Sequence, residues 1–362
     1  MKKLRVGVLG ATGMVGQRFI SLLDGHPFFE VVVVAASPAS AGKRYRQAVA
    51  KRWYMESPIP TRVGNLAVMA MENDFDRIVK EVDLVFSALD MDKEKIKQIE
   101  IRFAKAGIPV ASNNSAHRWT VDVPMVMPEI NQEHLKLIDV QRKNRGWTTG
   151  LIGVKPNCSI QSYVSILTAL KRFEPTKVHV TSLQAISGAG KTFETWPEMA
   201  DNLIPFIGGE ELKSEREPMK IWGKMVDGKI KNARKPVIAA TCIRVPATDG
   251  HMASVSVTFK RKPSRKQIVS AIESFNPLKN LRLPSSPKRF IKYLSDESRP
   301  QTRVDRNFED GMGITMGRLR EGKQFDWHFI ALSHNTVRGA AGGAILMAEL
   351  LYKKGYVESL AK

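Results

Sequence analysis

The sequence predicts an α/β protein: a doubly wound parallel sheet, then an α+β domain, then a C-terminal helix that returns to the first domain. Three observations predict this arrangement. Apolar strand patterns alternate with helical patterns in the first half of the chain, which is typical of a parallel sheet. After Gly150 the pattern changes, and strands appear in which apolar and polar residues alternate, as in half-buried strands. The segment 335–344 is rich in glycine and alanine, which suits a helix packed tightly against other elements.

In the first half, each predicted strand is a predominantly apolar run, as expected for a sheet buried on both faces. Between the last two strands lies a charged helical segment that ends at Gly107. The predicted strands are Leu4–Leu9, Val31–Ala36, Leu84–Ala88 and Val110–Ser112, and the predicted helices are Met14–Leu23 and Lys93–Ala106.

The second half combines an apolar helix with strands of mixed exposure. Val255, Val257 and Phe259 alternate with hydroxyl side chains, the pattern of a half-buried antiparallel strand. Only Pro246–Gly250 separates this strand from the preceding one, so we expect the two to form a hairpin. The predicted helix is Ser159–Phe173, the predicted strands are Val178–Leu183, Pro236–Val245 and Met252–Phe259, and Ile204–Glu217 and Lys260–Arg265 are expected to be loops or exposed faces.

The tail is expected to form a helix over Ile345–Leu351 that ends near Gly355. We therefore divide the chain into a first domain over residues 1–156, a second over 157–333 and the returning helix over 334–362. The length of 362 residues allows each of the two domains its own core.

The composition is that of an ordinary globular protein, with 43% hydrophobic and 25% charged residues. Met1–Leu4 leads directly into a strand pattern, which leaves no room for a signal peptide, and no apolar run approaches membrane-spanning length. We expect a cytoplasmic protein with no membrane partner.

The net charge of +20, from 56 basic and 36 acidic residues, raises the possibility of nucleic-acid binding. The basic residues are spread along the chain, however, and no nucleic-acid module is recognisable. The charge favours attraction of anionic substrates and cofactors and no nucleic-acid partner, with a generally solvated surface as the alternative.

A glycine-rich loop, Gly10-Ala11-Thr12-Gly13-Met14-Val15-Gly16, follows the first strand and opens the first helix. Glycines in this position let the backbone approach a pyrophosphate, and the helix N-terminus stabilises its charge. The spacing G-x-x-G-x-x-G is looser than the strict dinucleotide motif, but its place between strand and helix predicts a Rossmann-like cofactor site.

The end of the second strand distinguishes between cofactors. An NAD site usually carries an acid there to bind the ribose 2′-hydroxyl, whereas this chain has Ser37, Ser40, Lys43 and Arg44. Hydroxyls and cations suit a 2′-phosphate, so NADP is predicted, with NAD as a weaker alternative.

Cys158 is one of only two cysteines and lies in the run Lys155-Pro156-Asn157-Cys158-Ser159. A thiol at a helix start gains from the helix dipole, which favours the nucleophilic thiolate. The amide of Asn157 could stabilise an oxyanion formed by attack on a carbonyl. The alternative is a small buried residue in a strand–helix corner.

His251 and Arg244 are expected at the two sides of the predicted hairpin mouth. Arginine offers a bidentate fork for a substrate carboxylate, and neutral histidine can accept or return a proton. Gln184 ends another strand, and the glycine-rich turn after it, which includes Ser187 and Gly188, could bring the backbone close to a nicotinamide.

Several motifs together resemble the aspartate-β-semialdehyde dehydrogenase family, in its archaeal and fungal branch, over nearly the whole chain. The motifs that carry the resemblance are Gly10 to Gly16, Pro156-Asn157-Cys158-Ser159, Gln184 to Gly190, Asn202 to Ile207, Arg244-Val245-Pro246 with Asp249-Gly250-His251, Asp305-Arg306-Asn307, and His334 to Gly342. Lys155 departs from the commoner Asn-Pro-Asn-Cys-Ser-Thr motif, as do the residues after Ser159.

The resemblance implies a role for each matched residue. Cys158 would be the nucleophile, His251 the acid/base, Gln184 the residue that positions the acyl intermediate, and Asn157 a contact to phosphate or oxyanion. Arg244 would bind the substrate carboxylate, Glu210 or Glu211 its amino group, and Lys213 phosphate. The implied cofactor site consists of Gly10, Thr12, Gly13, Met14, Val15, Ser37, Ser40, Lys43, Ser87, Leu89, Ser187, Gly188, Asn335 and Thr336.

The implied reaction is NADP-dependent reductive dephosphorylation of L-4-aspartyl phosphate to L-aspartate 4-semialdehyde through a Cys158 thioester, in aspartate-family amino-acid biosynthesis. The expected partners are a small anionic substrate and phosphate, with assembly as a homodimer or homotetramer. One alternative is a malonyl-CoA or other acyl-CoA reductase on the same fold. A remote alternative is a non-catalytic dinucleotide-sensing or nucleic-acid-binding protein.

Overall fold

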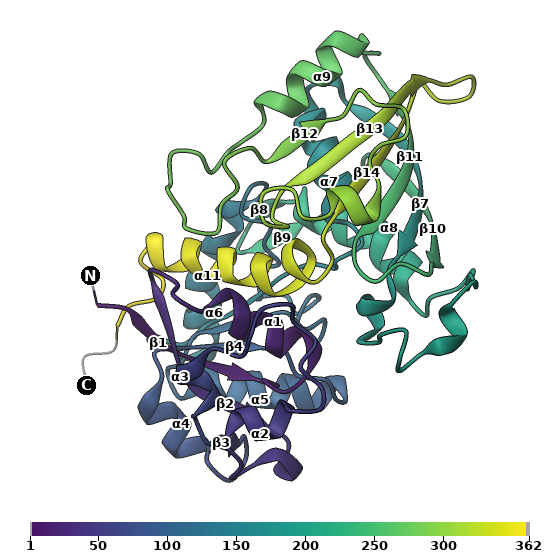
Figure 1. Cartoon of the computed structure of the whole chain (residues 1–362). Helices are drawn as coiled ribbons and strands as arrows, with labels where there is room; N and C mark the ends of the chain where they lie inside the picture. Colours follow the sequence, from purple (N-terminus) through teal and green to yellow (C-terminus); the bar gives the residue numbers. More distant parts are fainter. Residues whose placement is uncertain (1, 360–362) are drawn as a thin grey trace.

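The computed structural model describes residues 2–359. Two six-stranded sheets make up its framework, and the C-terminal helix lies between the two halves that contain them (Figure 1). The first sheet has the order β3-β2-β1-β4-β5-β6 and is parallel throughout, which confirms the predicted doubly wound architecture. Its strands are β1 (Leu4–Leu9), β2 (Phe29–Ala36), β3 (Val68–Ala70), β4 (Leu84–Ser87), β5 (Val110–Ser112) and β6 (Ile152–Val154).

The helices of this half connect the parallel strands. In α5, Asp92 caps the N-terminus by accepting hydrogen bonds from the backbone N–H groups of Glu94 and Lys95. β3, β6, α2, α3, α4 and α6 were not among the predicted elements. The helices are α1 (Met14–Leu22), α2 (Tyr45–Val49), α3 (Thr61–Gly64), α4 (Phe75–Glu81), α5 (Lys93–Lys105) and α6 (Leu137–Arg145), with 3₁₀ turns at Pro38–Ser40 and Gln132–Lys136.

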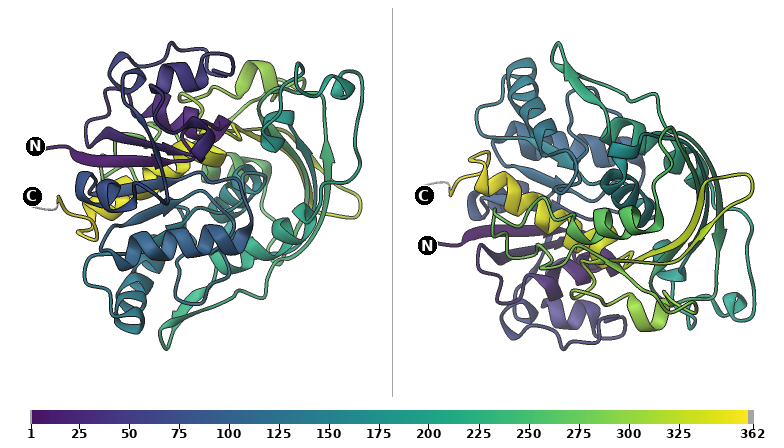
Figure 2. Two further views of the ribbon diagram at one scale, coloured as in Figure 1. Left: turned by 90° about the horizontal axis from the view of Figure 1, so that it is seen from below. Right: turned by 90° about the horizontal axis from the view of Figure 1, so that it is seen from above.

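The second sheet is mixed and has the order β10-β7-β11-β14-β13-β12. It forms a curved layer on the side of the molecule away from the termini (Figure 2). Its strands are β7 (Pro175–Gln184), β10 (Val237–Arg244), β11 (His251–Phe259), β12 (Ile291–Tyr293), β13 (Ile314–Glu321) and β14 (Trp327–Ser333). A separate small hairpin joins β8 (Lys224–Val226) and β9 (Lys229–Lys231).

The helices of the second half are α7 (Gln161–Ala169), α8 (Glu210–Ile221), α9 (Arg265–Ser274) and α10 (Thr302–Asp305). Short 3₁₀ turns lie at Lys171–Phe173, Ile186–Ala189 and Pro197–Met199. The apolar residues of α7 are buried in the same core cluster as the inward side chains of β11 and β14. A capping box between Ser264 and Gln267 begins α9.

Two expectations about this half are wrong. The predicted hairpin does not form: β10 pairs with β7 in parallel, and β7 separates β10 from β11. A short connection between two strands does not reveal that both pair with a third strand that is distant in sequence. Here Pro246–Gly250 crosses the end of β7. The segment predicted as a loop over Ile204–Glu217 contains the first two turns of α8, because its buried polar residues find partners such as the Arg118 guanidinium, which binds Glu217.

The predicted helix over Ser159–Phe173 is shorter than expected. Its regular part begins at Gln161 and ends at Ala169, and a 3₁₀ turn follows. The Asn157 side chain accepts hydrogen bonds from the backbone N–H and hydroxyl of Ser159, and this local turn replaces the first helical residues.

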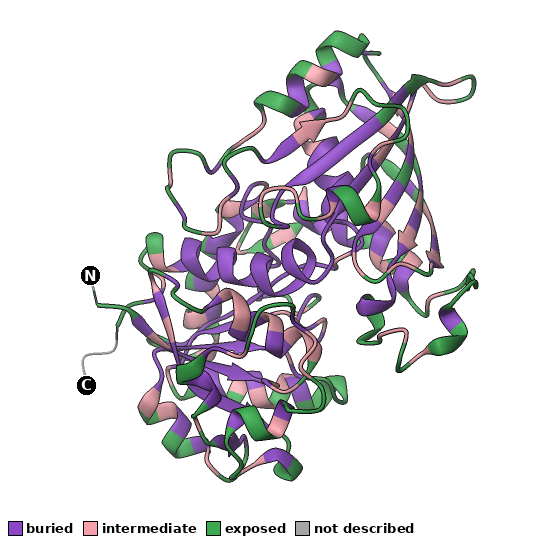
Figure 3. Cartoon of the chain, in the orientation of Figure 1, coloured by how far each residue is buried: buried purple, intermediate pink, exposed green. Residues whose placement is uncertain are grey.

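The C-terminal segment returns to the first half as expected. A π-helical turn over Val337–Ala341 leads into α11 (Gly342–Lys353), whose first ten residues are all buried (Figure 3). A Cβ on Gly153 of β6 would lie 3.6 Å from the sulfur of Met347, which shows how closely α11 packs on the first sheet. No helix within residues 2–359 is long and apolar enough to cross a membrane.

Candidate active site

Three strand ends of the second sheet bring Arg244, Gln184 and His251 to one level. Arg244 pairs with Gln184 across β10 and β7, and the register of β7 with β11 places His251 next to Gln184 on the other side. All three side chains are buried. The expected proximity of Arg244 and His251 is therefore present, although the two flank β7 and not a hairpin.

Cys158 lies between β6 and α7, half-buried, three residues before the first residue of α7. The C-terminal segment packs directly on it, since a Cβ on Gly339 would lie 2.7 Å from the Cys158 Cβ. Burial, and then the negative charge of Glu210, raise the pKa of the Cys158 thiol, while Lys155, Arg118 and Arg244 oppose the shift. The expectation that the helix start favours a resting thiolate is thus wrong, because desolvation outweighs the cations.

His251 carries one hydrogen bond that defines its chemistry. The backbone N–H of Ala185 donates to His251 Nδ1 at 3.1 Å, so the neutral ring carries its proton on Nε2. Nε2 is buried without a partner, and a Cβ on Gly188 would lie 3.0 Å from it. Burial, with Arg244 next in size, lowers the pKa of His251 well below its usual value. The ring is neutral at pH 7 and presents an N–H donor to the space beside Gly188.

Glu210, at the start of α8, connects several predicted site residues. Its carboxylate accepts hydrogen bonds from the Asn157 amide at 3.0 and 3.1 Å, from Lys213 Nζ at 2.6 Å and from Gln184 at 3.4 Å. The Asn157 amide is therefore bound to Glu210, and its backbone N–H donates to Glu217. This arrangement differs from the expected free oxyanion donor, because a buried carboxylate must be compensated by hydrogen-bond donors.

The structure separates the two glutamates that the sequence left open. The Glu211 carboxylate accepts a hydrogen bond from the backbone N–H of Cys242 on β10 at 3.2 Å. Glu210 faces the site with Arg244 nearby, and its negative charge opposes the lowering of the Arg244 pKa by burial. Of the two glutamates, Glu210 is the one that contacts Asn157 and Gln184. One Arg244 nitrogen donates to the Ala185 carbonyl at 2.7 Å, which fixes the guanidinium.

The glycine-rich loop has the geometry that a dinucleotide requires. A Cβ on Gly10 would lie 2.3 Å from the Ala88 carbonyl, and one on Gly16 would lie 2.2 Å from the Gly10 carbonyl, so neither position accepts another residue. Gly13 is exposed at the N-cap of α1, where no side chain caps the helix. The first N–H groups of α1, flanked by the half-buried Thr12, Met14 and Val15, are thus available to a pyrophosphate.

The remaining cofactor candidates lie at the carboxyl ends of β2 and β4. Lys43 and Ser37 are exposed on the loop after β2, and Lys43 Nζ donates to the Ala39 carbonyl at 3.1 Å. Ser40 lies 3.5 Å from Arg52, a cation that sequence reasoning missed. Ser87 ends β4, where the Asn114 amide donates to its hydroxyl, and Leu89 is buried beyond it.

A polar cluster joins the turn after β7 to the C-terminal segment. Ser187 donates to Asp249 at 2.7 Å and accepts from the Asn335 amide at 2.8 Å. The Asn335 carbonyl oxygen accepts from the backbone N–H of Gly250, and Thr336 donates to Asp249 at 3.4 Å. The predicted residues Ser187, Asn335 and Thr336 are therefore in contact, and Asp249, quoted in a motif but given no role, connects them.

Sequence reasoning also missed the buried cations around the thiol. Lys155 and Arg118 are both buried, and their positive charges favour the Cys158 thiolate. Arg118 Nη1 binds Glu217 at 2.9 Å, and its Nε donates to the Lys155 carbonyl. The signal for Lys155 was its departure from the common motif beside Cys158. Arg118 gave no signal, because it is distant in sequence.

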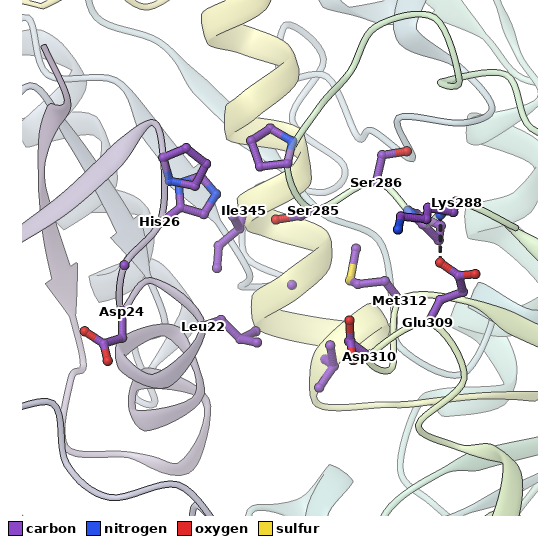
Figure 4. A pocket seen from close by; sticks show the side chains of 16 residues that line it. Leu22, Asp24, His26, Ser285, Ser286, Lys288, Glu309, Asp310, Met312 and Ile345 are labelled. Carbon is purple, nitrogen blue, oxygen red and sulfur yellow. Dashed lines mark hydrogen bonds between the residues drawn. The ribbon is translucent and has the colours of Figure 1, made fainter. Parts of the chain in front are cut away.

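The structure also contains a cavity of about 420 Å³ elsewhere (Figure 4). It lies between the end of α1, α11 and the segments around Ser285 and Glu309, and none of the predicted site residues lines it. Within residues 2–359, no group of three or more His, Cys, Asp or Glu side chains could hold a metal ion.

Comparison with known proteins gives consistent results. Residues 5–138 match the family model described as semialdehyde dehydrogenase, NAD binding domain, and residues 167–338 match semialdehyde dehydrogenase, dimerisation domain. The chain is 45% identical to aspartate-semialdehyde dehydrogenase of Archaeoglobus fulgidus, over 96% of this chain and 98% of the relative. The Saccharomyces cerevisiae enzyme is 38% identical, over 97% and 98% of the two chains.

A solved structure agrees with these sequence matches. The crystal structure of aspartate semialdehyde dehydrogenase with NADP from Candida albicans superimposes with a TM-score of 0.86 at 35% identity. The match covers 98% of this chain and 100% of that one.

Proposed function

The chain belongs to the aspartate-semialdehyde dehydrogenase family, and from that premise we propose that it converts L-4-aspartyl phosphate to L-aspartate 4-semialdehyde with NADP as cofactor. The proposal rests on one observation: Arg244, Gln184 and His251 lie side by side at the ends of three neighbouring strands, around the half-buried thiol of Cys158. The pathway is the biosynthesis of aspartate-family amino acids.

Cys158 is the group that forms the covalent bond. Its thiolate attacks the acyl carbon of the substrate, phosphate leaves, and a thioester remains on the protein. NADPH supplies the hydride that reduces this acyl group. A covalent thioester divides one difficult displacement into two easier steps.

His251 acts as a donor at Nε2. Because Nδ1 is held by the Ala185 N–H, the neutral ring can donate a hydrogen bond to the oxygen on which negative charge develops. Gln184, which lies between Arg244 and His251 in the sheet register, positions the acyl group from the neighbouring strand.

Arg244 and Glu210 recognise the two charged ends of the amino acid. One nitrogen of the Arg244 guanidinium donates to the Ala185 carbonyl, and the other nitrogens would donate to the substrate carboxylate. Glu210 accepts the substrate ammonium by exchanging a hydrogen bond that it now receives from Asn157 or Lys213. If the Asn157 bond is exchanged, the Asn157 amide becomes free to bind the oxyanion. If the Lys213 bond is exchanged, the Lys213 ammonium becomes free to bind phosphate.

The glycine loop and α1 N-terminus would hold the pyrophosphate of NADP, and Ser37, Ser40 and Lys43 its 2′-phosphate. We further propose a homodimer or homotetramer in the cytoplasm, and a division of the chain at residues 1–156, 157–333 and 334–362.

The test is a pair of assays on the purified protein. We expect NADP reduction with aspartate semialdehyde and phosphate, and much weaker oxidation of NADPH by malonyl-CoA, which has no ammonium for Glu210. Cys158→Ala is the matched inactive variant. Better turnover of malonyl-CoA than of aspartate semialdehyde would reject the aspartyl substrate but leave the thiol mechanism in place.

A further inference from the structure

Arg338, in the segment before α11, is the largest side chain that is fully buried within residues 2–359. Its two terminal nitrogens, Nη1 and Nη2, lie 2.5 and 2.6 Å from the two carboxylate oxygens of Glu129, and both side chains are only 1% exposed. The guanidinium carbon also lies 4.8 Å from the centroid of the Phe290 ring. A bidentate ion pair that is shielded from water in this way fixes the orientation of the guanidinium.

Stability alone does not account for this ion pair. Taking two charges out of water is costly, and apolar residues of similar volume often stabilise a core as well as a buried ion pair does. The pair is also incompletely satisfied, since no described residue forms a hydrogen bond with the buried Nε of Arg338. What two directional hydrogen bonds supply, and apolar packing does not, is a fixed geometry.

The two partners of Arg338 belong to different halves of the molecule. Glu129 lies in the segment that continues along the first sheet, where the backbone N–H of Val126 donates to the Val154 carbonyl of β6 at 2.9 Å. Phe290 directly precedes β12 of the second sheet. Arg338 therefore connects the half that contains the cofactor loop with the half that contains the second sheet.

The backbone next to Arg338 covers the nucleophile. A Cβ on Gly339, the following residue, would lie 2.7 Å from the Cys158 Cβ. Ala340 then has φ −142° and ψ −106°, so the segment departs from a regular helix immediately after this contact. Because Arg338 and Gly339 are adjacent in the chain, a displacement of Arg338 moves the backbone that covers Cys158.

We propose that Arg338 and Glu129 are positioning residues for catalysis. Their ion pair holds the turn over Val337–Ala341 in place, and with it the distance between Cys158 and the bound cofactor. Asn335, a candidate for cofactor binding, lies two residues before this turn. A misplacement of the reacting atoms by about 1 Å costs on the order of 10²-fold in rate. The inference rests on the proposed function, since it takes Cys158 as the nucleophile and NADPH as the hydride donor.

A double replacement separates positioning from stability. Arg338→Met alone leaves the Glu129 carboxylate buried without its partner, and we expect it to destabilise the fold. In Glu129→Gln/Arg338→Met neither charge remains and the side-chain volumes are nearly kept, so thermal unfolding should show a fold close to wild type in stability. For this variant we expect kcat with aspartate semialdehyde, phosphate and NADP to fall at least about 10-fold, with KM values within threefold of wild type. A pair with only a structural role would recover kcat together with stability.

Alkylation of Cys158 by iodoacetamide, located by mass spectrometry, is a second measurement that needs neither substrate nor cofactor. Loss of the ion pair loosens the backbone over the thiol, so the double variant should react several-fold faster than the wild type. Asp83→Asn/Arg5→Met is the matched control. Arg5 also binds Asp83 through two nitrogens, at 2.8 and 3.3 Å, but at the ends of β1 and β4 opposite to the cofactor loop. The control should keep the wild-type kcat and alkylation rate.

Wild-type kcat in a stable Glu129→Gln/Arg338→Met variant would overturn the proposal, and so would an equal loss of kcat in the Arg5 control. Arg338→Lys serves as the test should the double variant not fold, because it keeps the charge but not the two-bond fork. Its kcat should also fall, and an unchanged kcat would contradict the proposal. If the wild type does not turn over aspartate semialdehyde but the double variant is alkylated faster than the wild type, the proposed function fails and the positioning of Cys158 by Arg338 stands.

Discussion

The backbone N–H of Ala185 donates to Nδ1 of His251, and this bond determines which ring nitrogen carries the proton. Ala185 follows the last residue of β7, and His251 is the first residue of β11, so the sheet itself fixes the tautomer. The consequence is that His251 presents its Nε2–H as a hydrogen-bond donor in the site.

Replacement of His251 tests its role as donor. We expect His251→Asn to lower kcat by about 10²–10⁴-fold, the usual contribution of a positioned acid or base, with a smaller change in KM. Steady-state kinetics with aspartate semialdehyde, phosphate and NADP would measure this. A kcat within threefold of wild type would show that the Nε2–H donor is dispensable.

Glu210 and Glu211 form a matched pair for testing substrate recognition. Glu210→Gln removes the charge that binds the substrate ammonium, so we expect kcat/KM for aspartate semialdehyde to fall by at least about 10-fold, equivalent to 1.4 kcal/mol. Glu211→Gln should change it little, because Glu211 contacts the backbone of Cys242. Equal effects of the two changes would refute the assignment of Glu210.

Cofactor preference should depend on Lys43. A charge-assisted hydrogen bond to the 2′-phosphate contributes roughly 1.5–3 kcal/mol, so Lys43→Ala should reduce the preference for NADP over NAD by at least about 10-fold. Its kcat/KM with NAD should remain unchanged. Lys80→Ala, which removes an exposed cation from α4, is the control. If the ratio of kcat/KM with NADP to kcat/KM with NAD is unaltered in Lys43→Ala, Lys43 does not bind the 2′-phosphate. Arg52 would then be the next residue to test.

Lys155 should reduce stability in a pH-dependent way. Its folded pKa of about 7 lies below the ordinary value of 10.5, so the folded state binds fewer protons than the unfolded state between these values. The free energy of unfolding therefore rises with pH across this window, and the full penalty is present below pH 7. Lys155→Met should thus be more stable than wild type at pH 7, by at most about 4 kcal/mol.

The advantage of Lys155→Met should shrink as the pH is raised towards 10. Denaturant unfolding at pH 7 and pH 9.5 would measure both differences. A methionine variant that is less stable than wild type at pH 7 would mean that the hydrogen bond to Pro156 outweighs the cost of burying the amine.

The local patterns of the first sheet were sufficient to locate most of its strands. Leu4–Leu9 and Val110–Ser112 were predicted with their observed bounds, because a predominantly apolar run between turns is a local signal. The elements α3, β3 and α4, between residues 61 and 81, have only four, three and seven residues and gave no comparable signal.

The sequence by itself determined the family, the dinucleotide loop and the thiol, because each depends on residues adjacent in the chain. Only the tertiary structure decided that β7 separates β10 from β11, that Glu210 and not Glu211 contacts Asn157, and that Lys155 is buried. Strand partners, burial and proton positions depend on groups that are distant in sequence, and their energies exist only once the chain has folded.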